Sequence, residues 1–174
     1  MLKIITVVTG YLRENCYIIH NDKDALIIDP GDDSNKIISS VGNLNVLGIL
    51  ITHYHFDHIG ALDEVKDKYS KAKLIDFKSK KEQNIGNFNF KIIENFGHTM
   101  DSVSYYFEKE KMLFCGDFVF RDSIGNHEEE DAPIMINSLR EFKKLDRDIK
   151  VYPGHGDYTS VGYEIDHNIF MKGI

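Results

Sequence analysis

The chain has 174 residues, of which 42% are hydrophobic, and a formal net charge of −7. This length and apolar content predict one globular domain over residues 1–174 and exclude disorder as the default state. The negative charge argues against a nucleic-acid partner, because phosphate binding needs an exposed basic surface. No apolar segment reaches the length of a membrane span, and two cysteines are too few for a disulfide framework. We therefore expect a cytoplasmic protein without membrane contact.

Apolar periodicity and turn residues predict strands that alternate with helices along the chain. In chain order we expect a β-meander over 2–9, 15–20 and 24–29, a helix over 34–41, a strand over 46–51, a helix over 59–69, a strand over 73–77, hairpin strands over 87–94 and 102–114, a helix over 133–145, a strand over 149–152 and a helix over about 160–171. Periodicity alone indicates a layered α/β or α+β domain.

Three histidines and one aspartate lie within six positions directly after the apolar run 46–51, as His53, His55, Asp57 and His58. A strand that ends in His-x-His sends both rings to the same side, because side chains alternate across the pleat. Four nitrogen and oxygen donors this close together suit a transition metal better than a hydrophobic core. The alternative is a polar loop that happens to be rich in histidine.

Three further donors, His98, Asp117 and His155, each follow a predicted strand in a turn that contains glycine. Glycine allows the backbone angles that aim a donor inward and lets a metal approach closely. The recurrence of such turns disfavours the simple polar loop. Cys115, two positions before Asp117, is expected to point to the same side as Asp117. We expect both thiols, Cys16 and Cys115, to be buried and inert.

These donors resemble the ligand set of the metallo-β-lactamase superfamily, above all its glyoxalase II (hydroxyacylglutathione hydrolase) branch. Three flanking segments are similar to that branch as well: Glu14–Ile19 to its Asn-Cys-Tyr segment, Leu26–Gly31 to its Asp-Pro-Gly strand end, and Pro153–Asn168 to its last ligand and closing helix. The resemblance covers nearly the whole chain. It implies an α+β fold, the αββα sandwich, in which two facing mixed β-sheets carry helices on their outer faces and metals at one edge.

The resemblance also implies two divalent metal ions, with zinc as the first expectation and iron or manganese as alternatives. His53, His55 and His98 would hold the first ion, Asp57, His58 and His155 the second, and Asp117 would bridge them. A hydroxide that bridges the metals would attack the acyl carbon of a small-molecule ester or thioester. Asp57 would both bind metal and accept the proton of the nucleophile.

Other functions remain open at this stage. A mononuclear iron oxidoreductase of the persulfide dioxygenase type has the same fold but uses two histidines and one aspartate. A metallo-nuclease would need an RNA-binding arm or a basic groove, which this acidic chain does not show. A purely structural metal site is the weakest alternative, because such sites are closed.

The resemblance is incomplete where the substrate would be recognised. Glyoxalase II proper has a C-terminal helical domain that binds glutathione, and we expect that domain and its glutathione site to be missing here. Another thiol carrier or ester is therefore possible as substrate. We expect His127 and the acidic run Glu128–Asp131 to be solvated, and Tyr54 and Phe56 to face away from the metals, packed in the sandwich or forming a wall of the pocket.

Overall fold

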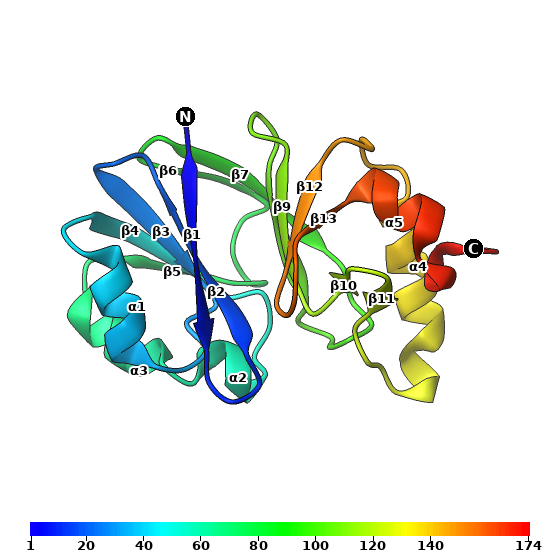
Figure 1. The fold of residues 1–174 in the computed structure, drawn as a ribbon, viewed down its shortest axis with the longest axis horizontal. Coiled ribbons are helices and arrows are strands. Elements are labelled where there is room, and N and C mark those ends of the chain that lie inside the picture. The colour runs from blue at the N-terminus through cyan, green and yellow to red at the C-terminus, as the bar shows by residue number, and fades with distance from the viewer.

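Two β-sheets face each other in the computed structural model, which describes residues 1–174 (Figure 1). The first sheet has the order β1 (Lys3–Thr9), β2 (Glu14–His20), β3 (Asp24–Ile28), β4 (Asn45–Leu50) and β5 (Lys73–Ile75). The second has the order β13 (Thr159–Ser160), β12 (Lys150–Pro153), β9 (Met112–Gly116), β8 (Val103–Phe107), β7 (Phe88–Glu94) and β6 (Glu82–Ile85). A small separate hairpin joins β10 (Val119–Phe120) to β11 (Ser123–Ile124).

Both large sheets are mixed. In the first, β3 pairs with β4 and β4 with β5 in parallel, while β1, β2 and β3 are antiparallel. In the second, only β9 and β12 are parallel. The helices are α1 (Ser34–Val41), α2 (Phe56–Ile59), α3 (Leu62–Lys68), α4 (Ala132–Phe142) and α5 (Val161–His167), with 3-10 turns η1 (Glu129–Asp131) and η2 (Ile169–Met171). No helix is long and apolar enough to cross a lipid bilayer.

The hydrophobic core has three layers, which explains why the strands are apolar on both faces. The central cluster fills the space between the sheets and includes Tyr17 of β2 and Tyr105 of β8. A second cluster packs α1 and α3 against the outer face of the first sheet, and a third packs α4 and α5 against the second. This arrangement of helices outside two facing sheets confirms the predicted αββα sandwich.

One predicted helix is divided in the structure. Most of the expected helix over 59–69 is α3, which begins only at Leu62; Ile59 is the last residue of the separate helix α2, and Gly60 and Ala61 lie between the two. The Ala61 N–H donates to the carbonyls of Pro30 and Gly31 at 3.0 and 3.1 Å, and a Cβ on Gly60 would collide with the Gly31 carbonyl. The chain is therefore tied to the turn after β3 at this point, a tertiary contact that apolar spacing does not reveal.

Candidate metal centre

The predicted metal ligands all lie in segments that follow strands at one edge of the sandwich. The turn after β4 carries His53 and His55, and the helix α2 that continues it carries Asp57 and His58. The turns after β7, β9 and β12 carry His98, Asp117 and His155. The strand β4 belongs to the first sheet and the other three strands to the second. The candidate centre is thus assembled from both sheets, at the lower edge in Figure 1, where α2 also lies.

Three histidines form a first group of donors. The Nδ1 atom of His55 lies 3.1 Å from Nε2 of His53 and 2.9 Å from Nε2 of His98. One donor atom from each ring lies within 4.8 Å of the other two. Three imidazole nitrogens that converge in this way are suited to hold a divalent metal ion.

A second group contains Asp57, His58 and His155, whose donor atoms also lie within 4.8 Å of one another. The carboxylate of Asp57 is 3.2 Å from Nε2 of His155 and 3.9 Å from Nε2 of His58. Asp117 lies between the groups: its Oδ1 is 3.2 Å from Nε2 of His58, and its Oδ2 is 3.6 Å from Nε2 of His155 and 3.8 Å from Nε2 of His98. This one carboxylate therefore faces donors of both groups.

Two buried polar atoms at the centre have no hydrogen-bond partner, Nε2 of His58 and Oδ1 of Asp117. An unpaired buried polar atom is costly unless a ligand or ion satisfies it. Gly154 keeps this space open, since a Cβ there would collide with Asp117 and with the His58 ring. The donor set and its two unpaired atoms fit a divalent cation.

Three of the predicted histidine ligands turn their other ring nitrogen, Nδ1, toward a carbonyl or carboxylate oxygen of the protein. These oxygens are a carboxylate oxygen of Asp29 at 2.9 Å for His58, the Asn126 carbonyl at 2.6 Å for His98 and the Leu12 carbonyl at 3.1 Å for His155. Because an unprotonated oxygen can only accept, each ring carries its proton on Nδ1. Nε2 is then the atom of each ring that would bind a metal.

Burial and neighbouring charges set the protonation of the centre. Burial lowers the pKa of His53 to about 2, so this ring is a neutral ligand. Burial also opposes a charge on His58, but the adjacent Asp117 carboxylate, 3.2 Å away, and the hydrogen bond with Asp29 outweigh burial and raise its pKa well above the usual value. Burial would raise the pKa of Asp117, but the adjacent His58 ring outweighs burial and lowers it to about 2. A proton on His58 thus holds the place that a cation would take.

Two buried acids beside the centre, Asp29 and Glu14, were not predicted from the sequence. Asp29 accepts hydrogen bonds from the Thr52 N–H and hydroxyl at 2.7 and 2.6 Å, in addition to the bond from His58. Glu14 accepts from the Thr9 hydroxyl at 2.8 Å, and burial followed by the charge of Asp29 raises its pKa to about 10. Asp29 and Glu14 lie in the Asp-Pro-Gly and Glu-Asn-Cys-Tyr segments of the sequence. The residues next to them in the chain do not indicate which partners their side chains contact.

Cys115 does not point to the side of Asp117, so that expectation is wrong. The strand β9 ends at Gly116, whose φ of +51° interrupts the alternation of side chains. Cys115 packs in the third core cluster, with Sγ 3.3 Å from the Val119 carbonyl, and burial raises its pKa to about 12. Cys16 is buried in the second cluster, where burial raises its pKa well above the usual value.

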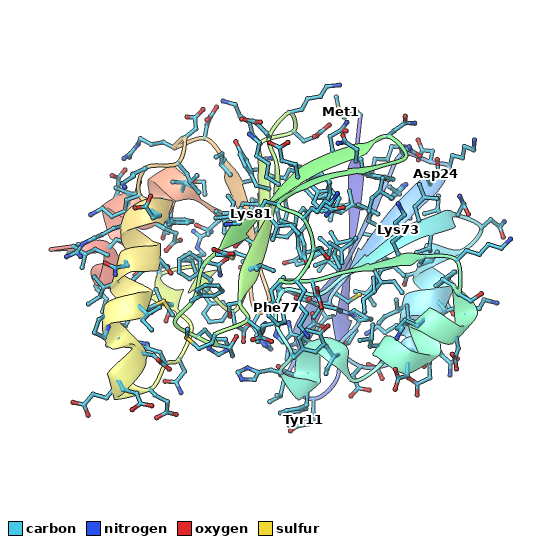
Figure 2. All side chains as sticks on the ribbon, turned by 180° about the vertical axis from the view of Figure 1, so that it is seen from behind. Met1, Tyr11, Asp24, Lys73, Phe77 and Lys81 are labelled. Carbon is cyan, nitrogen blue, oxygen red and sulfur yellow. The ribbon has the colours of Figure 1, made fainter.

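The aromatic residues between the first ligands do not pack inside the sandwich. Tyr54 lies on the surface and donates to Asp76 at 2.8 Å. Phe56 is 62% exposed and forms one wall of a hollow of about 220 Å³ beside Asp57, together with Tyr11 from the β1–β2 turn. Figure 2 shows Tyr11 at this edge of the molecule, below α2. The acidic run Glu128–Asp131 is not buried, as expected.

Sequence and structure comparisons with known proteins agree with the metal centre that the geometry indicates. The sequence profile described as "Metallo-beta-lactamase superfamily" matches residues 9–76 and 73–155. Hydroxyacylglutathione hydrolase GloC of Haemophilus influenzae is 30% identical, with 97% of each chain covered. The crystal structure of the B3 metallo-beta-lactamase BLEG-1 superposes with a TM-score of 0.91 at 32% identity, over 99% of this chain and 100% of that one. TTHA1623, solved in a di-iron-bound form, has a TM-score of 0.85 at 25% identity, over 95% and 99% of the two chains. The chain belongs to the metallo-beta-lactamase superfamily.

Proposed function

We propose that the protein is a binuclear metallohydrolase that cleaves thioesters. The observation that carries this proposal is the position of Asp117, whose carboxylate lies beside donors of both groups. A carboxylate in that position suits a pair of cations rather than a single one. The 30% identity to a hydroxyacylglutathione hydrolase over nearly the whole of both chains supports an acyl-thiol substrate.

Each residue has a distinct part in the proposed centre. The first ion would be held by His53, His55 and His98, the second by Asp57, His58 and His155, with Asp117 shared between them. Two bound divalent cations lower the pKa of a water between them and stabilise negative charge on an attacked carbonyl. Nitrogen and oxygen donors suit zinc, which we propose, and also iron or manganese. The di-iron-bound form of TTHA1623 supports two ions and keeps iron as the main alternative.

Asp57 is suited to move a proton as well as to bind metal. Its carboxylate is 3.2 Å from Nε2 of His155, and its side chain is 16% exposed, so it faces the open side of the centre. A carboxylate with one oxygen turned toward an attacking water accepts the proton of that water. His155 and His58 are fixed through their Nδ1 atoms and hold the neighbouring donors in place.

A thioester panel on zinc-loaded protein tests the function. Released thiol is measured for hydroxyacyl and simple acyl thioesters of glutathione and of a neutral thiol, with the Asp57→Asn variant as the inactive control. We expect hydrolysis of at least one thioester class that Asp57→Asn abolishes. Inactivity of the loaded protein on every acyl-thiol would refute the proposal. One iron per chain together with oxygen consumption on a persulfide would favour the dioxygenase-type alternative.

A further inference from the structure

Residues of the first sheet hold the turn of the second sheet that carries His155. The Tyr17 hydroxyl on β2 donates to the Pro153 carbonyl at 2.6 Å, across the interior of the sandwich. Two positions earlier, the Asn15 side-chain amide donates to the same carbonyl at 3.1 Å and to the Gly156 carbonyl at 2.9 Å. These two carbonyls stand on either side of His155 in the chain. The Asn-x-Tyr spacing puts both side chains on the same face of the strand.

The backbone adds a third bond to the same turn. The Asn15 N–H donates to the Gly154 carbonyl at 2.7 Å, so three carbonyls around His155 are bonded from β2. His155 itself is flanked by two glycines, and Gly156 has a φ of +76°. Glycine does little to fix a backbone by itself. The position of His155 therefore depends on contacts from outside its own turn.

The residues that make these bonds are rigid. Asn15 and Tyr17 are each 4% exposed. The Tyr17 ring packs edge-on against Phe114 at 5.2 Å and against Tyr152 at 5.8 Å between ring centres. Since a ring packed in this way has one orientation, its hydroxyl presents a fixed point to the Pro153 carbonyl.

We propose that Asn15 and Tyr17 are positioning residues that set the affinity of the second metal ion by holding His155. The inference rests on the dinuclear centre proposed above. The centre draws ligands from both sheets, so its geometry requires a fixed distance between them. A ligand must be held to within about half an ångström to bind well, and groups that hold ligands change metal affinity by about 10–100-fold.

The test is stepwise metal binding to Tyr17→Phe, Asn15→Ala and the double variant. Affinities for the first and second ion are measured by competition with a chromophoric chelator, and cobalt absorption shows which ligand set each ion occupies. Tyr17→Phe keeps the packed ring and should weaken the second ion by about three- to tenfold. The double variant should weaken the second ion by about 10–100-fold. The first ion should bind as in wild type, and excess metal should restore turnover.

Tyr106→Phe is the matched control. Tyr106 lies on β8 and packs against the third core cluster, away from the His155 turn. This variant should bind both ions as wild type does, and the melting temperature of the metal-free proteins checks that each variant folds. Unchanged affinity for the second ion in Tyr17→Phe and in the double variant would overturn the inference. Equal weakening of both ions would do the same, since it would indicate a general structural role. Wild type that binds fewer than two ions would instead contradict the dinuclear centre itself.

Discussion

Replacing Asp29 by asparagine tests whether this buried carboxylate fixes the tautomer of His58. The carboxylate accepts three hydrogen bonds, from Nδ1 of His58 and from the N–H and hydroxyl of Thr52. Asparagine has the same shape but only one acceptor oxygen. If that oxygen keeps the hydrogen bond from the Thr52 N–H, the amide NH₂ of the asparagine faces Nδ1 of His58. The ring must then accept at Nδ1 and carry its proton on Nε2, the atom that would bind the metal.

The size of the effect follows from this change of tautomer. Loss of a group that orients a histidine ligand costs about 10–100-fold in metal affinity, or about 1.4–2.7 kcal/mol. We expect Asp29→Asn to weaken the second ion by this factor and to leave the first ion less affected. Backbone strain does not contribute, because the φ of Asp29 is +48° and asparagine tolerates that region as well as aspartate does.

The assay is chelator competition for each ion, with circular dichroism as a check of the fold. Asp22→Asn is the matched control, since Asp22 also has a positive φ, of +71°, but pairs with Lys3 on the surface. This control should bind both ions as wild type does. Equal affinity of Asp29→Asn and wild type for the second ion would refute the assignment of Asp29 as the residue that fixes His58.

Three other predictions follow from the same geometry. Asp57→Asn should lower kcat by at least about 100-fold without changing the circular dichroism spectrum, because it removes the proton acceptor; near-normal turnover would contradict that role. Metal binding near pH 7 should release a proton from His58. Burial opposes the charge of this ring, but the adjacent Asp117 carboxylate and the hydrogen bond with Asp29 keep its pKa above the usual value in the metal-free protein. Metal affinity should therefore fall as pH falls. Calorimetric heats of metal binding that do not depend on the ionisation enthalpy of the buffer would contradict the proton release. Neither Cys16 nor Cys115 should react with a disulfide reagent at pH 8 until the protein unfolds. Both thiols are buried, and burial raises the pKa of each, that of Cys115 to about 12. One reactive thiol in the native protein would contradict this packing.

The strands and the candidate ligands were predictable because their signals are local. The apolar run before His53 predicts a strand, and the glycines beside His98 and His155 mark the turns that end others. Parallel and antiparallel strands that end at one edge then bring these turns together. The assignment of the seven residues as metal ligands remains a prediction, which their convergence supports.

The residues that support the centre could not be predicted, because their partners are distant in the chain. Asp29 meets Thr52 only because β3 and β4 pair in parallel, with Ile28 opposite Leu50. Asn15 meets its turn across 138 positions. The direction of Cys115 failed for a different reason, since the alternation rule holds only while the strand continues and β9 ends at Gly116.

Anomalous diffraction from crystals of the zinc-loaded protein tests the central claim most directly. Two peaks should appear about 3.5–4 Å apart. One should lie among His53, His55 and His98, the other among Asp57, His58 and His155, with Asp117 touching both. A single peak, or peaks away from these side chains, would contradict the dinuclear centre.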